Sequence, residues 1–560
     1  MVNKQISAQF NLLAALMELH GENSFKIKAY LNAYQSLRKW DRPLIEMSDA
    51  EISAIPGIGA STASKIRDII STGTMEPLEK LKAITPIGIQ QLLSIKGLGP
   101  KKIRAIWDEL GVESPAELLY ACTENRLVKL TGFGLKTQED LQNKISYFLD
   151  SQDKHLYGAI ESELDQFIQF WQKHFAEYEI EWVGEVARKC PVVSSIECLI
   201  SPQFYPAKFH GLEQIQLLEQ YSDQKFSIRF DDRFAIQCHT TSKEDKYVNW
   251  SKLTMSESLF EKLSPAYSTP YLLTGGIAEN AKNPYQVLAE NGFEGLPPEL
   301  MDYEGIEKCL PEKWTDLITV KDIRGVLHNH SNWSDGSNTL EEMALHVRGM
   351  GYEYFGITDH SKTAFYANGL QPERVLQQLE EIDRLNRNLA PFKIFKGIES
   401  DILTDGSLDY DEEILRKFDF IVASIHSNLR MDEEKATARL IGAIENPYTR
   451  ILGHPTSRLL LARPGYPIDY KKVIDACAAN GVVMELNSNP QRMDIDYSWL
   501  EYCQEKGVMV SINPDAHSRT QVGYIKYGVF SARKGVLKKE NCLNAKGLGE
   551  FEKWIERREM

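Results

Sequence analysis

Several features that would place this 560-residue chain in other classes of protein are missing. Its eight cysteines are scattered and form no CxxC pair, which argues against disulfides and structural zinc fingers and favours a reducing, cytoplasmic setting. No run of about 18 apolar residues occurs, so no membrane span is expected. Glu18 and His20 interrupt the first apolar stretch, as in an amphipathic helix and unlike a signal peptide.

Positive charge is also in short supply. The formal net charge is −15 and the isoelectric point is near 5.4, which excludes a uniformly basic nucleic-acid binder. Contact with DNA would therefore need a local basic surface, and its affinity should be modest and sensitive to salt. The length predicts about three to five domains, and we expect a monomer.

Between residues 320 and 560 the chain contains seven short apolar runs. Each is rich in Val, Ile, Leu and Phe without a helical period, and helical stretches separate the runs. This alternation is typical of a βα barrel or a doubly wound parallel sheet, where functional groups gather at the carboxyl ends of the strands. The runs cover residues 324–330, 352–360, 392–400, 418–426, 449–455, 481–487 and 507–517.

Potential metal ligands lie at the ends of these runs. Six of the 12 histidines fall there, more than satisfied core histidines would explain. Imidazoles and carboxylates without thiolates suit zinc, manganese or iron, and their number exceeds the needs of one ion. We therefore predict two or three divalent ions that activate water for attack on a phosphoester. The candidates are His328, His330, Asp335, Asp359, His360, Glu399, His426, His454, Glu485, Asn487, Asp515 and His517.

Seven motifs follow one another here: HNHSNWSDG, ITDHS, GIESDI, ASIHS, LGHPTSR, ELNSNP and PDAHS. In this order they resemble the polymerase-and-histidinol-phosphatase (PHP) domain, which implies a (β/α)7 barrel with a trinuclear site and Glu399 as a bridging, catalytic carboxylate. We predict that Arg458 holds a phosphate, with a surface arginine as the alternative, and that Asp359 orients a ligand histidine. The resemblance implies as metal ligands His328, His330, Asp335, His360, Glu399, His426, His454, Asp515 and His517.

Three segments of the N-terminal region share a Gly-hydrophobic-Gly pattern before a helix, which makes an internal repeat. Such a pattern lets the backbone turn tightly, and the amides that begin the next helix favour an anion. The segments resemble helix-hairpin-helix motifs, which bind DNA phosphates without reading bases. The third copy, Gly132 to Gly134, has fewer basic followers, and a purely structural role is open for it. Predicted DNA contacts are Gly57, Gly59, Lys65, Gly97, Gly99, Lys101 and Lys102, with Arg104 nearby.

The segments SFKIKAYLNAYQSL and GIGASTASK make residues 1–150 resemble the lyase-type and fingers domains of family X DNA polymerases, the polymerase beta relatives. The resemblance implies that Lys26 and Tyr30 contact phosphate. It also places Lys65 where that family has its Schiff-base lysine, whereas Ser61 stands where a second lysine often occurs. A lyase role and a plain phosphate contact both stay open for Lys65.

Residues 155–315 are then expected to form a palm and a thumb, but the catalytic pattern of that family is missing. The family has Gly-Ser-x-Arg-Arg followed by Asp-x-Asp. Here Glu185 replaces the serine, and Ser195 and Glu197 stand where the two aspartates belong. Two carboxylates at i and i+2 on one strand face are needed to bridge two Mg²⁺ ions. We therefore predict a degenerate palm without this Mg²⁺ pair and with little or no polymerase activity.

The third aspartate of the family pattern is also missing. Ala235 lies near its place, a few residues after Asp231 and Asp232. The opposing hypothesis is a shifted register in which Asp231 or Asp232, together with Glu197, holds one metal ion.

These patterns predict a multidomain chain. Its parts are N-terminal all-α helix-hairpin-helix domains, an α+β nucleotidyltransferase-like palm and thumb, and a C-terminal α/β barrel of the (β/α)7 type. The expected domains are 1–80 (lyase-type helix-hairpin-helix), 81–150 (fingers-like helix-hairpin-helix), 151–240 (degenerate palm), 241–315 (thumb-like) and 320–560 (PHP).

Taken together, the motifs resemble the bacterial and archaeal PolX family, which implies DNA repair. We predict a metal-dependent 3′–5′ exonuclease or phosphodiesterase that acts, without sequence preference, on gapped, nicked or single-stranded DNA ends. One alternative is an active DNA polymerase with a 3′–5′ exonuclease, which the palm residues oppose. A second alternative is a histidinol-phosphatase-like enzyme for small molecules, which would give the N-terminal half no function. A third is a noncatalytic DNA-binding scaffold, which would leave the nine candidate metal ligands unexplained.

Overall fold

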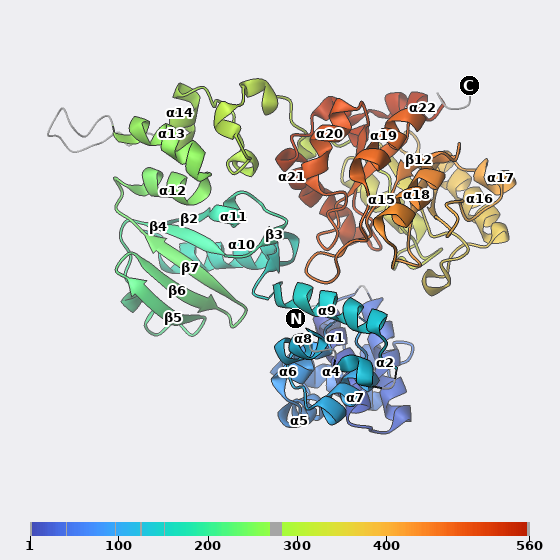
Figure 1. Cartoon of the computed structure of the whole chain (residues 1–560), viewed down its shortest axis with the longest axis horizontal. Helices are drawn as coiled ribbons and strands as arrows, with labels where there is room; N and C mark the ends of the chain where they lie inside the picture. The colour runs from blue at the N-terminus through green and yellow to red at the C-terminus, as the bar shows by residue number, and fades with distance from the viewer. Residues whose placement is uncertain are drawn as a thin grey trace. The chain divides into compact units, whose positions relative to one another are not determined.

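The computed structural model describes residues 3–40, 42–95, 97–123, 126–130, 132–150, 152–268 and 283–556 (Figure 1). It divides into two compact units, Met1–Gln152 with Leu461–Pro464 and Asp153–Leu460 with Gly465–Met560. Across the described residues, none of the helices combines the length and apolarity that a membrane crossing requires. All eight cysteines are free thiols.

The first unit is helical and contains the three predicted hairpins. In each, the central apolar residue (Ile58, Leu98 or Phe133) is at most 5% exposed. The glycine before it has a left-handed φ of 83° to 92°, which favours glycine over residues with a Cβ. The helices are α1 (Asn3–Leu19), α2 (Ser24–Arg38), α3 (Asp49–Ser53), α4 (Ala60–Thr72), α5 (Glu76–Ile84), α6 (Ile87–Leu92), α7 (Pro100–Leu110), α8 (Pro115–Thr123) and α9 (Leu135–Asp150).

The second unit begins with a five-stranded mixed sheet in the order β2-β4-β7-β6-β5. Only β4 and β7 run parallel, and Phe167 and Trp171 of helix α10 pack in the apolar core of this sheet. The elements are α10 (Tyr157–His174), β2 (Glu179–Val183), α11 (Gly184–Ala187), β4 (Glu197–Ser201), β5 (Ile215–Ser222), β6 (Lys225–Phe230) and β7 (Phe234–Thr240). In the residues described on either side of 269–282, the helices α12 (Lys246–Thr254), α13 (Glu257–Ser268) and α14 (Pro284–Glu290) follow around a separate core.

Seven parallel strands in sequence order form the C-terminal part. A bridge between Asn329 and Ala516 links the two outermost strand ends, so the sheet is a nearly closed barrel and the predicted (β/α)7 fold is confirmed. The strands are β8 (Gly325–Val326), β9 (Tyr354–Ile357), β10 (Lys393–Asp401), β11 (Phe420–Ser424), β12 (Thr449–Leu452), β13 (Val483–Asn487) and β14 (Val510–Asn513).

Helices connect the barrel strands (Figure 1). They are α15 (Leu340–Gly349), α16 (Pro372–Leu389), α17 (Glu412–Leu415), α18 (Glu433–Ile444), α19 (Tyr470–Asn480) and α20 (Leu500–Glu505), with α21 (Ile525–Lys534) after the last strand. Helix α22 (Leu548–Glu556) packs Phe551 on Tyr354, at the amino end of β9, with ring centroids 4.6 Å apart. The opposite, carboxyl ends of the strands carry the polar site.

Candidate metal centre and palm

The carboxyl ends of the barrel strands bring all nine predicted metal ligands together. Their ligand atoms form four overlapping groups, and within each group these atoms lie within 4.8 Å of one another. The groups are His330–Asp335–His360–His517, His328–His454–Asp515, His328–His330–Glu399 and His360–Glu399–His426. Because the groups share members, they form one continuous cluster of candidate ligands.

Glu399 occupies the centre of this site. It lies in β10, is 1% exposed, and both of its oxygens face imidazole nitrogens. The nearest nitrogens belong to His360 (2.9 Å), His454 (2.9 Å), His426 (3.1 Å), His328 (3.3 Å) and His330 (3.6 Å). This geometry fits the bridging role that the PHP resemblance implies.

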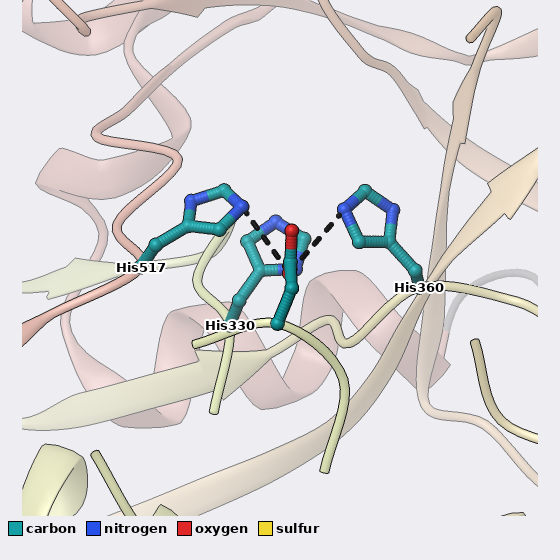
Figure 2. A group of neighbouring side chains, drawn as sticks. His330, His360 and His517 are labelled. Atoms are coloured by element: carbon teal, nitrogen blue, oxygen red, sulfur yellow. Dashed lines mark ion pairs between the residues drawn. The ribbon is translucent and has the colours of Figure 1, made fainter. Parts of the chain in front are cut away.

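The outer edge of the site is formed by Asp335 and His517, whose side chains are 27% and 33% exposed. Asp335 lies 3.3 Å from Nε2 of His517 and 3.6 Å from Nε2 of His360. Figure 2 shows the rings of His330, His360 and His517 gathered around one small space. A substrate would therefore meet this edge first.

The donor set fits divalent cations. Nε2 of His328 and Nδ1 of His330 are buried and have no hydrogen-bond partner among the described residues, as expected of nitrogens whose partner is a metal ion. Burial, together with neighbouring His517 and His360, lowers the pKa of His330 to about 3, so this ring is neutral at ordinary pH. Burial also lowers the pKa of His426, but Glu399 and Asp401 outweigh it and raise that pKa to about 10.

Two carboxylates outside the ligand set orient ligand histidines. Glu485 in β13 lies 2.8 Å from Nδ1 of His328, and Asp401 in β10 contacts Nδ1 of His426. Glu485 was recognised from the sequence as a residue at a strand end, but Asp401 was missed. Its signal was present, because Asp401 follows Glu399 by two residues and so lies on the same face of the strand.

Changing Glu485 to Gln should weaken metal binding about 10- to 100-fold, because the amide removes the negative charge beside His328. Competition with a chromogenic chelator measures this affinity. The exposed Glu413→Gln variant is the matched control. Unchanged affinity in Glu485→Gln would show that this carboxylate has no part in metal binding.

Asp359 has a different role from the one predicted. It is fully buried and accepts hydrogen bonds from Ser331, Ser334 and Gln378, with no contact to a ligand histidine among its hydrogen bonds. Asp359 therefore holds the turn that leads from His330 to Asp335. The prediction that Asp359 orients a ligand histidine was wrong, because its carboxylate accepts hydrogen bonds from this turn and from Gln378 instead.

The guanidinium group of Arg458 is hydrogen-bonded to a loop of the barrel. Its guanidinium pairs with Asp496 at 2.8 Å and donates to the carbonyl oxygens of Arg492, at 2.9 Å, and Met493. In contrast, Nε of Arg492 lies 3.2 Å from Asp515, one of the ligands. This geometry places Arg492 beside the candidate metal ligands, and Arg458 holds the Arg492 backbone.

The predicted DNA contacts of the first hairpin lie on two helices. Lys26 is exposed on α2, the helix that also carries Tyr30. Nζ of Lys65, on α4, lies 6.0 Å from the centroid of the Tyr30 ring and 3.0 Å from Oγ of Ser61. Lys65, Tyr30 and Ser61 thus form one cluster beside the Gly57–Gly59 turn.

The second hairpin is the more basic one. Lys101 and Lys102 are exposed in the first turn of α7, directly after Gly97 and Gly99, and Arg104 pairs with Asp108 at 2.6 Å. The third hairpin buries Phe133, which lies 5.9 Å from Nζ of Lys102. The third copy thus packs beside the second, and this agrees with a structural role.

Among its described residues, the palm-like sheet brings together no group of three or more side chains that could hold a metal ion. Nε2 of His239 lies 2.8 Å from Glu197, and this hydrogen bond lowers the pKa of the Glu197 carboxyl group. The Glu185 carboxylate accepts the backbone N–H groups of Ser194 (2.5 Å) and Ser195 (3.2 Å). Glu185 therefore places a negative charge on two backbone donors that an anionic ligand would otherwise use.

The shifted register proposed for Asp231 and Asp232 does not match this sheet. Both are exposed in the turn before β7, with φ of 47° and 54°. Glu197 pairs in parallel register with Gln237, five residues after Asp232, which separates them by roughly 16 Å along the strand. Ala235 in β7, which lies near the place of the third aspartate of the family pattern, offers no carboxylate.

Family models match three parts of the chain. A model described as "Helix-hairpin-helix domain" covers residues 1–75, and "SAM-like Helix-hairpin-helix tandem" covers residues 89–145. A third, "PHP domain", covers residues 327–514. Fold and site thus define a PHP-domain protein with N-terminal helix-hairpin-helix domains.

Comparison with curated proteins identifies the family. The chain is 33% identical to a Bacillus subtilis (strain 168) protein named "DNA polymerase/3′-5′ exonuclease PolX", over 100% of both chains. The chain therefore belongs to the PolX family, the family X DNA polymerases with a PHP domain. A "Probable phosphatase" of Acetivibrio thermocellus is 31% identical over 35% of this chain and 80% of its own length. Another, from Thermoanaerobacter sp. (strain X514), is 29% identical over 38% of this chain and 91% of its own.

Proposed function

We propose that this PolX-family protein is a DNA-repair enzyme whose barrel acts as a metal-dependent 3′–5′ exonuclease or phosphodiesterase, and that its palm has lost nucleotidyl transfer. The observation that carries the proposal is the convergence of nine candidate ligands, with the buried Glu399 at their centre. Two or three divalent ions, manganese, zinc or iron, fit this oxygen and nitrogen donor set.

When bound, these ions supply activation of water and neutralise charge on the phosphoryl oxygens. Glu399 would bridge them, since each of its oxygens faces a different set of imidazoles. Glu485 and Asp401 keep His328 and His426 in position. Arg492, beside Asp515, would contact a non-bridging phosphate oxygen, and Arg458 fixes the loop that carries it.

The choice of DNA over a small phosphate ester rests on the rest of the chain. The probable phosphatases match only about a third of it, whereas the PolX protein matches it throughout. Two helix-hairpin-helix family matches precede the barrel and supply a sequence-independent grip on DNA phosphates. We propose gapped, nicked and single-stranded DNA ends as the substrates. The proposed location is the cytoplasm, where the chromosome of a bacterial relative lies.

A 5′-labelled gapped duplex and a 5′-labelled single strand, incubated with Mn²⁺ with and without dNTPs, test the proposal. We expect both labelled strands to shorten from the 3′ end, with no lengthening when dNTPs are present. Excess EDTA should stop the reaction, and added Mn²⁺ should restore it. Full activity in excess EDTA, or hydrolysis of histidinol phosphate with intact DNA, would contradict the proposal.

The double variant Lys101→Ala/Lys102→Ala should bind DNA about tenfold more weakly. Its log–log salt dependence should also be shallower by about 2, one for each lost phosphate contact. Fluorescence anisotropy with a labelled duplex at several salt concentrations measures both quantities. The control is Lys80→Ala/Lys82→Ala on α5, where both lysines pair with glutamates. Equal salt slopes for the two double variants would remove α7 from the DNA contact.

A further inference from the structure

A short loop joins β9 to α16 and begins at the ligand His360. The backbone N–H of Leu370 donates to the carbonyl oxygen of His360 at 2.8 Å, so the two ends of the loop meet. Glycine at position 369 makes this close approach possible, because a Cβ there would lie 1.9 Å from the carbonyl oxygen of Ser361. The loop is therefore a tight hairpin directly on the rim of the metal site.

Further hydrogen bonds hold this loop to the barrel. Thr363 donates its hydroxyl to Asp401 at 2.9 Å and its backbone N–H to Asp409 at 2.7 Å. The N–H of Ser361 donates to the carbonyl oxygen of Glu399 at 3.0 Å. Since Asp401 also contacts His426, the loop is tied to the same groups that position the ligands.

At the tip of this held loop, Phe365 is 82% exposed. No other large apolar side chain in the described part of the barrel is as exposed, the next being Leu376 at 44%. A phenylalanine this exposed gives up most of the free energy that its burial would contribute to folding. Because hydrogen bonds hold this loop and it begins at His360, the ring of Phe365 is presented to any ligand that reaches this end of the barrel.

We propose that Phe365 is a stacking platform for an unpaired nucleobase of the DNA strand that enters the barrel. Aromatic side chains bind bases of any sequence through their faces, which suits an enzyme without sequence preference. This inference rests on the proposed function and adds to it the recognition of a polynucleotide end, with unpaired bases, over a small phosphate ester.

A cavity at the same end of the barrel offers space for the adjoining part of the strand. It lies between the loops that follow β10 and β11 and has a volume of about 520 Å³. Arg430, Lys435 and Arg439 line it together with Asn428, two residues after the ligand His426. Arg430 and Lys435 are exposed and suit the phosphates next to the one that is cleaved, whereas the buried Arg439 donates to the carbonyl oxygens of the two loops.

The test compares two single-stranded oligonucleotides that differ only in their last two 3′ residues, which are ordinary nucleotides in one and abasic sites in the other. Steady-state kinetics with Mn²⁺ would be measured for the wild type, Phe365→Ala and Phe365→Trp. The control is Leu310→Ala, which removes a side chain that is 72% exposed outside the barrel. Because Phe365 is exposed, its removal should leave the fold intact, and Phe365→Trp keeps an aromatic face.

We expect Phe365→Ala to raise KM for the ordinary oligonucleotide about tenfold, with kcat within about twofold of the wild type, and Phe365→Trp to retain the wild-type KM. On the abasic oligonucleotide, wild type and Phe365→Ala should converge. Equal losses on both oligonucleotides would overturn the inference, and so would no loss on either. The second result would instead indicate that Phe365 contacts a protein partner.

Failure of the proposed function is distinguishable from failure of this inference. A wild-type protein that hydrolyses neither oligonucleotide refutes the exonuclease. Tetranucleotide versions of the two substrates, added as competitors in an anisotropy assay, would then decide the inference. A preference of about tenfold for the base-bearing tetranucleotide that Phe365→Ala abolishes supports stacking, and the absence of any preference overturns it.

Discussion

Glu399→Gln should reduce the Mn²⁺-dependent hydrolysis of single-stranded DNA at least about a thousandfold. The wild-type carboxylate faces five imidazoles, so it would bridge the ions and balance their charge. An amide keeps the shape but offers one neutral oxygen. A loss of several kcal/mol in transition-state stabilisation corresponds to this fold-change, at about 1.36 kcal/mol for each factor of ten.

The loss should be accompanied by fewer bound metal ions per chain, measured by mass spectrometry of the dialysed protein. Far-ultraviolet circular dichroism should stay unchanged, which separates loss of the site from loss of the fold. Glu413→Gln, an exposed carboxylate on α17, should keep both full activity and full metal content. A Glu399→Gln protein with near wild-type hydrolysis would contradict the bridging role.

Extension of a primer across a one-nucleotide gap should be at least about a thousandfold slower than with the Bacillus subtilis relative in the same assay. Nucleotidyl transfer needs several carboxylates to hold two Mg²⁺ ions against the triphosphate. In this palm, Glu197 shares its strand face with Glu181 and Glu179 of β2. Glu197 is engaged by His239, and the other two pair with Lys246. Glu185 also occupies the amides of Ser194 and Ser195.

A partial repair of this site should not restore extension. Ser195→Asp returns one carboxylate, but Ala235 still leaves the third position without charge, so this variant should stay at the wild-type level. Single-nucleotide incorporation on a denaturing gel, with the relative as the positive control, measures both proteins. Robust incorporation by the unaltered chain would show that the palm binds Mg²⁺ in another way.

The barrel and the convergence of its candidate ligands were predictable because two independent patterns coincide in the sequence. Apolar runs without helical period locate the strands, and a His, Asp or Glu at the end of each run locates the site. The rule that carboxyl ends of parallel strands share one edge then brings together residues as far apart as His328 and His517. The fold of the helical unit was equally accessible, since each Gly-hydrophobic-Gly turn needs a positive φ.

What the sequence did not reveal depends on contacts between distant loops. Arg458 follows His454 by four residues and so invites a role at the phosphate, yet its partners lie 34 to 38 positions further along the chain. Arg492 and the exposed Phe365 carry no motif signal of their own. The positions of both side chains follow from loop conformation, which local sequence pattern does not determine.

Diffraction data collected at the manganese absorption edge, from crystals grown with Mn²⁺, test the central claim most directly. Two or three anomalous peaks should lie among the nine ligands, each at roughly 2.0–2.3 Å from the nearest histidine nitrogens and carboxylate oxygens, and one pair should share Glu399. An empty barrel mouth, in crystals of protein that hydrolyses DNA under the same conditions, would contradict it.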